Sequence, residues 1–474
     1  MTRSGRRVRE PEVTRRQRTR RLDVVTVLAV VLPLVTVGSL ALVRTQSVRD
    51  TTRPPSLTRL TSATVVCPSQ QSGSPEASVS TAADASGSLT VLSGGGSTQV
   101  QVAPHAVSPL TGSGAQVVKG SEDLAPGLLG LRSGTAPLTA LACPVPTAEQ
   151  WFTGVGARAD HDSVIELTNP DGGPAVAEVT LFGDHEFSSR RLRGLTIPGH
   201  KTISLDLGAI VPRRSAVSAR VVVSRGRLGV AVLDQRTDLV AHQTYAEWLP
   251  SQLAPATAND LLGLPTGKGK RFLQIANPGT EVVRAQVKVV TSDTRFTPQG
   301  LAPVPVAPGT TASVNLTKAL GQALGDGAVG VSVTADAPVT ASLLTQLAHD
   351  RALTAPDPTI TREAATLLPT MPGKGPQHRG ATTATLRIGA DQAGAAQVTA
   401  YDASGTTLSS RTVGLQEGRV AEVALPPGTA FLDVVPARTT IRAAVLVAGD
   451  GATVVPLHEL LTQGLVPQIW PGQD

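Results

Sequence analysis

The stretch Leu167-Thr168-Asn169-Pro170-Asp171-Gly172 returns 108 residues later as Ile275-Ala276-Asn277-Pro278-Gly279. Downstream of each copy, a Pro-Gly turn precedes a short alternating segment, Ile197-Pro198-Gly199 before 203–207 and Ala307-Pro308-Gly309 before 312–316. A weaker third copy places Glu417-Gly418 before 421–425. Self-similarity at a long, nearly fixed period indicates tandem structural repeats.

The alternating segments have the period of two that is typical of half-buried strands, and each follows a Gly suited to a tight turn. In the second copy this phase predicts that Val314 and Leu316 face inward while Ser313 and Asn315 face outward. Six or seven short strands over about 105–110 residues match an immunoglobulin-like sandwich. We therefore predict an all-β fold with tandem immunoglobulin-like β-sandwich repeats at 151–258, 259–368 and 369–474, and short helices at 245–253 and 317–324.

Residues 61–147 are rich in Ser, Gly and Ala and contain short alternating runs, which predict a small β module. The part at 69–98 could instead be partly disordered. Cys67 and Cys143 are the two cysteines of the chain, and in an oxidising compartment two cysteines indicate one disulfide. Such a bridge closes a loop of about 75 residues and would contribute roughly 4 kcal/mol by the loop-entropy estimate.

The N-terminal segments predict a membrane anchor. Residues 1–23 carry nine arginines against three acidic residues, which accounts for the whole net charge of +6. Residues 24–43 follow without a charge, long enough as a helix to cross a hydrocarbon core of about 30 Å. The positive-inside rule predicts a single-pass plasma-membrane protein with its N-terminus cytoplasmic and its C-terminus extracytoplasmic, joined to the modules by a stalk at 44–60.

Alternatives to a retained anchor stay open. A cleaved signal peptide needs an A-x-A-like site, and the nearest match is Ser39-Leu40-Ala41. Thr19-Arg20-Arg21 suggests a twin-arginine signal, although Asp23 stands where an apolar residue is expected. The arginines could also bind nucleic acid, but we interpret them as an orientation signal on anionic lipid and expect no nucleic-acid partner.

Motifs for chemistry are sparse. Asp160-His161-Asp162 and Asp184-His185-Glu186 could hold a divalent cation if they met in space. The stretch 263–268 is one residue too short for a phosphate loop, and Gly269 stands where Ser or Thr would bind magnesium. A Ser-His-Asp triad from distant loops stays open. We predict no catalytic, cofactor or metal site.

Aromatic residues make up only 2% of the chain, which argues against sugar platforms and single-stranded nucleic-acid grooves that depend on stacking. The aromatic residues near repeat boundaries are Trp151, Phe152, Tyr245, Trp248 and Trp470. They either pack between modules or anchor a partner.

A family resemblance follows from several of these motifs. Cys143-Pro144, the run from Glu149 to Gly154 and the first Asn-Pro copy resemble an actinobacterial family of membrane-anchored secreted proteins, domain of unknown function 5719. Residues 272–279, 296–301 and 337–341 resemble its second repeat, and the similarity extends over roughly 60–474. The resemblance implies a cell-envelope location and supplies no catalytic residues.

These features favour a non-enzymatic, membrane-anchored cell-envelope protein, in which a row of β modules binds or scaffolds another envelope protein or a cell-wall polymer. The alternative is a cell-wall polymer-modifying enzyme with an unrecognised site, which a deep pocket with converging carboxylates or a Ser-His pair would favour. A sensor is disfavoured because a 23-residue tail leaves little room for cytoplasmic output.

Overall fold

The computed structural model describes residues 24–42, 56–71, 75–135, 137–187, 189–239, 243–348, 350–369 and 382–466. The chain divides into two units, Met1–Ser56 with Leu465–Asp474 and Leu57–Gly464. We call the second unit the head and group its strands by the sheets they form. The predicted tail at 1–23 and most of the predicted stalk lie outside the described residues.

The first unit contains one described helix, α1 (Val24–Leu42), with Pro33 inside it. No helix among the described residues has the length and apolarity that crossing a membrane requires. The transmembrane helix expected at 24–43 therefore stays a prediction.

The small module consists of two four-stranded sheets, ordered β2-β7-β4-β5 and β6-β3-β8-β9. Its strands are β2 (Ser62–Cys67), β3 (Glu76–Thr81), β4 (Gly87–Ser93), β5 (Gly96–Val102), β6 (Ser108–Leu110), β7 (Gln116–Ser121), β8 (Leu128–Thr135) and β9 (Leu138–Ala142). Cys67 at the end of β2 and Cys143 just after β9 form the predicted disulfide, which joins the two sheets within their shared core. Both the disulfide and the all-β class are thereby confirmed.

Repeat 1 is one continuous sheet, ordered β13-β12-β16-β10-β11-β17-β18, with β14 on β12 and β15 on β11. Its strands are β10 (Glu149–Arg158), β11 (His161–Thr168), β12 (Ala175–Phe182), β13 (Glu186–Phe187), β14 (Leu195–Ile197), β15 (Thr202–Asp206), β16 (Arg214–Arg225), β17 (Gly229–Asp238) and β18 (Gln243–Leu249). The sheet stays continuous because β10 pairs with β16 over most of its length and with β11 at its end.

Repeat 2 is also continuous, because the 19-residue strand β25 runs through both of its halves. Its strands are β19 (Ala256–Leu261), β20 (Lys270–Asn277), β21 (Val283–Thr291), β22 (Arg295–Phe296), β23 (Val304–Val306), β24 (Thr310–Asn315), β25 (Ala328–Gln346) and β26 (Arg351–Thr354). The first half of β25 pairs with β19 and β21, and its second half pairs with β20 and β26.

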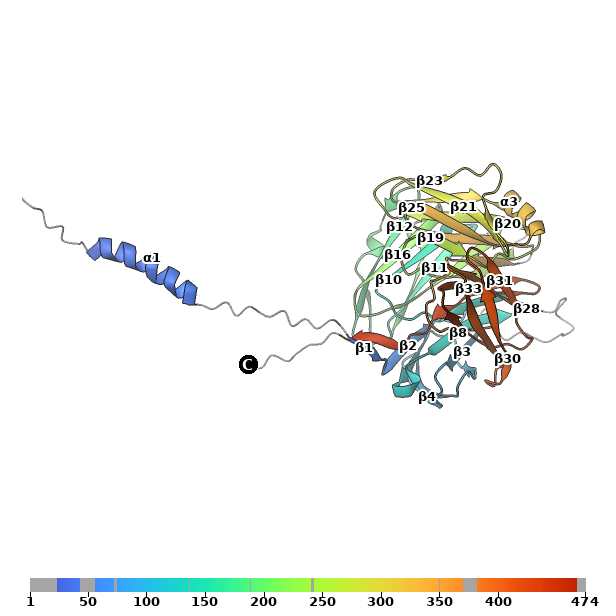
Figure 1. Ribbon diagram of the computed structural model, residues 1–474, viewed down its shortest axis with the longest axis horizontal. Coiled ribbons are helices and arrows are strands. Elements are labelled where there is room, and N and C mark those ends of the chain that lie inside the picture. The colour runs from blue at the N-terminus through green and yellow to red at the C-terminus, as the bar shows by residue number, and fades with distance from the viewer. Residues whose placement is uncertain are drawn as a thin grey trace, which may run out of the picture. The chain divides into compact units, whose positions relative to one another are not determined.

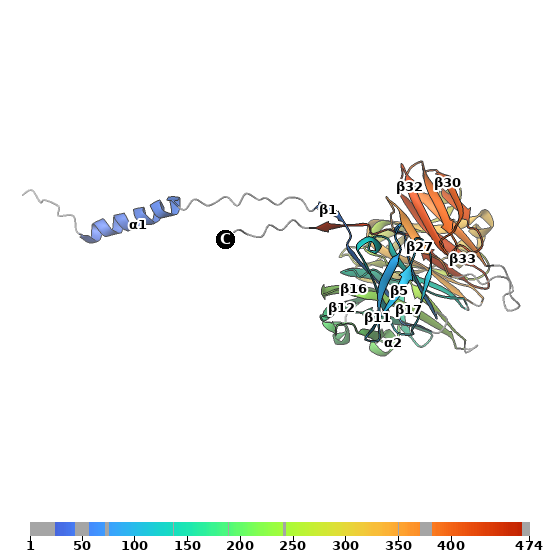
Figure 2. The same cartoon turned by 90° about the horizontal axis from the view of Figure 1, so that it is seen from below.

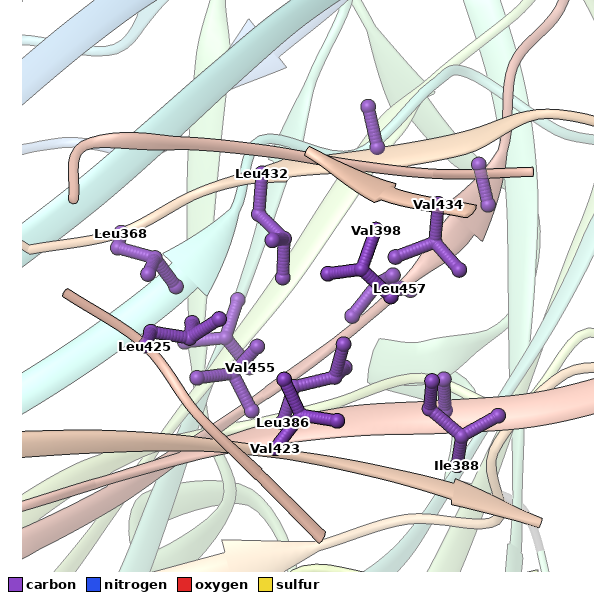
Figure 3. Close-up of a cluster of buried hydrophobic side chains, with 14 of the residues drawn as sticks. Leu368, Leu386, Ile388, Val398, Val423, Leu425, Leu432, Val434, Val455 and Leu457 are labelled. Carbon is purple, nitrogen blue, oxygen red and sulfur yellow. The ribbon is translucent and has the colours of Figure 1, made fainter. Parts of the chain in front are cut away.

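Repeat 3 returns to two separate sheets, ordered β30-β29-β32-β27-β35 and β31-β28-β33-β34. Its strands are β27 (Ala364–Leu367), β28 (Thr383–Ala390), β29 (Gly394–Tyr401), β30 (Thr407–Leu415), β31 (Val420–Ala424), β32 (Phe431–Ala437), β33 (Ile441–Ala448), β34 (Ala452–Pro456) and β35 (His458–Glu459). Figure 3 shows Val398, Leu432 and Val434 of one sheet meeting Leu386 and Ile388 of the other. Residues 364–367, assigned to repeat 2 from the sequence, pair within this repeat.

In repeats 1 and 2, the Asn side chain of the Asn-Pro motif bonds two backbone segments together in the same way. Asn169 donates through Nδ2 to the carbonyls of Gly173 (2.8 Å) and Ile197 (3.0 Å), and its Oδ1 accepts from a backbone N–H two residues on. Asn277 makes the same three bonds, to Glu281, Val306 and Gly279. Both side chains are buried, so each amide satisfies its own hydrogen-bonding groups by joining the Pro turn to a later strand.

Three local predictions have clear outcomes. Residues 317–324 begin as the predicted helix, α3 (Thr317–Ala323), and continue as a 3₁₀ turn. The helix predicted at 245–253 is wrong, because 243–249 form β18, which pairs with β17 along its length. The predicted phase of β24 is confirmed, since Leu316 is buried, Val314 packs against the core, and Ser313 and Asn315 are exposed.

The modules do not form the expected row. Each contacts its neighbour in the chain, and repeat 3 also packs on the small module, whose Leu131 and Leu138 belong to the repeat 3 core. In Figure 1 the labelled strands β2, β3, β4 and β8 accordingly lie beside β28, β30, β31 and β33. Figure 2 shows β27, β30, β32 and β33 above β5 and the strands of repeat 1. The chain of modules therefore closes on itself, which brings residues from all four of them to common junctions.

Candidate functional site

The predicted partner anchors are mostly internal. Trp151 is 3% exposed, and its Nε1 donates to Glu149 Oε1 at 2.9 Å. Phe152 lies in the repeat 1 core, and Trp248 is 2% exposed in a cluster with Ala231 and Leu233. Burial leaves these three rings little surface for a partner, so the structure favours packing for them. Tyr245 is half-buried, and Trp470 lies outside the described residues.

One strand from each module meets at a central junction. Strand β9 of the small module contacts β18 of repeat 1 and β34 of repeat 3, while β26 of repeat 2 contacts both β18 and β34. Charged side chains lie buried along these strands and the adjoining β17, a placement that costs free energy unless they are paired. We call Asp234, Glu247, Asp350 and Arg351 the junction charges.

Asp234 bonds to several side chains at the junction. It is fully buried on β17, and its Oδ1 lies 2.6 Å from His161 Nε2 and accepts from Ser163 Oγ at 2.7 Å. Arg351 reaches across from repeat 2 to donate to Asp234 Oδ2 at 3.1 Å and to its carbonyl at 2.8 Å. Burial opposes ionisation of Asp234, but His161 and Arg351 outweigh it and hold the pKa of Asp234 below its usual range. The carboxylate is therefore charged and bonded to both repeats.

This Ser, His and Asp grouping is not arranged as a catalytic triad. In a triad the Asp orients the His, and the His accepts the proton of the Ser hydroxyl. Here Ser163 donates to Asp234 instead, and the same oxygen bonds His161. Ser163 Oγ also accepts from the backbone N–H of Gly156 at 2.9 Å. With all three side chains buried, the hydroxyl is a structural bridge with no activated route to a substrate.

Glu247 and Asp350 bring two carboxyl groups to the same junction. Glu247 is 1% exposed, and burial together with the nearby Asp350 raises its pKa well above the ordinary range. Asp350 Oδ2 accepts from the backbone N–H of Ala452 in β34 at 2.8 Å, and burial raises the pKa of Asp350 to about 7. The carboxyl groups converge, as the enzyme alternative requires, but they line neither the cavity of about 500 Å³ in repeat 2 nor the cavity of about 610 Å³ beside the small module.

Buried arginines close the other contacts between modules. Arg387 of repeat 3 donates to the carbonyls of Leu264 (2.8 Å) and Val329 (2.7 Å) in repeat 2 while bonding Glu422 at 3.1 Å. Arg132 of the small module caps the Pro68 carbonyl at 2.6 Å and attracts Glu166 of repeat 1. Glu166 in turn accepts from the backbone N–H of Ser69 at 2.8 Å, so the small module and repeat 1 are bonded directly.

The two motifs that could have held a cation, at 160–162 and 184–186, do not form a common site. His161 is bonded to Asp234, while Asp162 accepts from the backbone N–H of Gly208 at 2.8 Å. Asp184 pairs with Arg214 at 2.6 Å on the surface. Across the described residues, no group of three His, Cys, Asp or Glu side chains is placed to hold a metal ion.

The head contains two cavities of similar size. One, of about 500 Å³, lies between residues 266–269 and the helical segment 317–325 in repeat 2. The other, of about 610 Å³, is lined by residues of the small module with Thr462 and Gln463. The cavity in repeat 2 is lined by part of the stretch 263–268, which departs from the phosphate-loop pattern.

Sequence reasoning missed the junction charges, although one signal was present. Asp234 has the same strand phase as Val230 and Val232, and Glu247 the same phase as Leu249. A charged residue in phase with inward apolar neighbours indicates a buried, partnered charge. The partner itself, 117 residues away in the case of Arg351, leaves no local trace.

Comparison with known proteins adds a family but no activity. Residues 121–426 match the family described as Family of unknown function (DUF5719), a narrower range than the resemblance suggested. No curated protein matches the chain.

Proposed function

Because the chain belongs to the family of unknown function DUF5719, we propose that it is a single-pass, membrane-anchored cell-envelope protein of actinobacterial type. Its extracytoplasmic head serves as a binding or scaffolding module. The observation that carries the proposal is the packing of four β modules into one closed head, in which the buried bonds between Asp234 and Arg351 join repeat 1 to repeat 2. A head locked in this way holds surfaces of different modules at fixed distances, as a scaffold requires.

The location is supported by three features. The buried disulfide between Cys67 and Cys143 suits an oxidising compartment. The uncharged segment 24–43 follows nine arginines, the order expected of an anchor whose N-terminus stays in the cytoplasm. The two facing sheets of repeat 3 support the immunoglobulin-like sandwich, a common extracellular binding unit.

The enzyme alternative depends on Glu247 and Asp350. Glycoside hydrolysis uses a pair of carboxyl groups, one of them a general acid with a raised pKa. Their burial among β18, β26 and β34 argues for a structural role, because a polymer would have to separate the modules to reach them. Glu247→Gln therefore leaves function intact in a scaffold and abolishes it in such an enzyme.

Protease treatment of protoplasts tests the topology. We expect the head to be removed and the arginine tail to be protected, with no full-length head in the medium. Crosslinking of intact membranes followed by capture of the chain then tests scaffolding. A discrete set of envelope proteins or a cell-wall polymer should be recovered with the wild type. Release of a chain that begins near Leu42 would contradict the anchor, and recovery of the chain alone would contradict the scaffold.

A further inference from the structure

Among the described residues of the head, four arginines are almost completely buried: Arg132, Arg271, Arg351 and Arg387. Three of them have a carboxylate that compensates their charge. Arg351 lies 3.1 Å from Asp234, Arg387 lies 3.1 Å from Glu422, and Arg132 is attracted by Glu166.

Arg271 is the exception. Within the described part of the chain, no carboxylate oxygen lies within 4.0 Å of its guanidinium, and no carboxylate attracts it from further away as Glu166 attracts Arg132, although the Arg271 side chain is only 1% exposed. Its Nη atoms donate to the carbonyls of Pro265 (3.2 Å), Gly267 (2.8 Å) and Gly269 (3.2 Å), and its Nε finds no acceptor. Carbonyl dipoles satisfy hydrogen bonds but leave the formal charge uncompensated, which is costly in a buried position.

The uncompensated charge borders a cavity. Arg271 lines the cavity of about 500 Å³ in repeat 2, together with the exposed Lys268. Thr317, Gly321 and Gly325 form the opposite wall, and no acidic side chain lines it. Its volume lies within the range of small-molecule sites, roughly 300–1,000 Å³. The cavity therefore has two cationic side chains and room for a small ligand.

We propose that this cavity binds the oxyanion group of a small ligand, a phosphate or a carboxylate, with Arg271 and Lys268 as its cationic partners. The oxyanion supplies the counter-charge that the other three buried arginines obtain from Glu or Asp. The site is distinct from a phosphate loop, because here the carbonyls of residues 265, 267 and 269 converge on the guanidinium. The inference goes beyond the proposed scaffold function and does not depend on it.

Titration calorimetry of the full chain with inorganic phosphate, and separately with acetate, tests the site at matched ionic strength in chloride buffer. We expect saturable binding of at least one anion. The stronger response assigns the chemical class. Lys268→Gln should weaken binding about tenfold, the scale of one charge-assisted hydrogen bond. Lys270→Gln, an exposed lysine outside the lining, is the control and should leave binding unchanged.

Replacing Arg271 itself would leave three carbonyls without donors and could unfold the repeat. A substitution at Gly321 therefore provides a second test. Gly321 lies on the cavity wall, and an added Cβ meets no atom within 4 Å. Gly321→Asp supplies the missing carboxylate from the protein itself and should abolish saturable binding, whereas Gly321→Ala should retain it. Absence of saturable binding to both anions in the wild type would overturn the proposal. Equal weakening by Lys268→Gln and Lys270→Gln would also overturn it, because binding would then be a general surface effect.

Discussion

The junction between repeats 1 and 2 combines a buried ion pair with apolar contacts of Leu344 and Leu353, whereas the junction between the small module and repeat 3 is apolar and aromatic. The first is held by Asp234, bonded to Arg351 across the interface and to His161 within repeat 1. In the second, Leu131 and Leu138 enter the repeat 3 core, and His105 stacks on Tyr401 with ring centroids 4.2 Å apart.

The difference shows how the head obtains both stable association of its modules and a single relative placement of them. Apolar burial is non-directional and tolerates several arrangements, so it supplies cohesion. A buried ion pair is costly when its partners separate, so it favours a single relative placement of the two repeats, which we take as its role here. The two junctions should therefore fail in different ways, and the following variants separate them.

The largest effect is expected at the charged junction. Asp234→Ala leaves the guanidinium of Arg351 buried without its carboxylate, which should lower the free energy of unfolding by about 3–5 kcal/mol. Urea unfolding followed by intrinsic fluorescence measures the change. Asp160→Ala, which breaks the exposed pair with Arg158, is the matched control and should cost about 1 kcal/mol or less. Similar losses in the two variants would contradict the role given to burial.

The apolar junction should lose slightly less. Leu131→Ala removes a buried side chain from the shared core and should cost about 2–5 kcal/mol. Hydrogen exchange should show lost protection in β8 and also in β27 of repeat 3, because both line that core. Leu89→Ala, in the small module's own core, should cost a similar amount with the loss confined to that module. Protection lost only in β8 after Leu131→Ala would show that the cores are separate.

The carboxyl pair makes the charged junction sensitive to pH. The pKa of Asp350 is raised to about 7 in the folded head, against about 3.9 for an unfolded chain. Between these values the folded state holds more protons, so stability falls as the pH rises toward 7. Asp350→Asn should flatten this slope and stabilise the head at pH 8 on the order of 2 kcal/mol, with no gain at pH 4. Urea midpoints from pH 4 to 8 measure the slope, and an unchanged slope in the variant would exclude Asp350 as its source.

The smallest effect belongs to the aromatic contact. His105 has a positive φ of 59° and stacks on Tyr401, so His105→Asn keeps a residue that tolerates this backbone while removing the ring. We expect a loss of about 1 kcal/mol, the scale of one aromatic pair. Thermal melts of the two proteins check it. A loss as large as that of Leu131→Ala would mean that the stack, and not the shared core, holds this junction.

The sequence predicted what is local and repeated. Asn169 and Asn277 stood out because the same turn chemistry recurs, and the structure shows them making the same bonds. The cysteine pair followed from cysteine count and compartment alone. The junction could not be predicted in this way, because Asp234 and Arg351 lie in different repeats and meet only through the packing of repeat 2 on repeat 1. His161 was noticed as a cation candidate, but its partner Asp234 lies on the neighbouring strand β17, opposite Ser163 and outside the local motif of His161.

Scanning calorimetry of the full chain tests most directly whether the four modules form one head. If the buried junctions lock them together, residues 57–464 should unfold in one transition whose calorimetric and van't Hoff enthalpies agree. Asp234→Ala should then split or broaden that transition. Several resolved transitions in the wild type, unchanged in number by Asp234→Ala, would show independent modules and contradict the account.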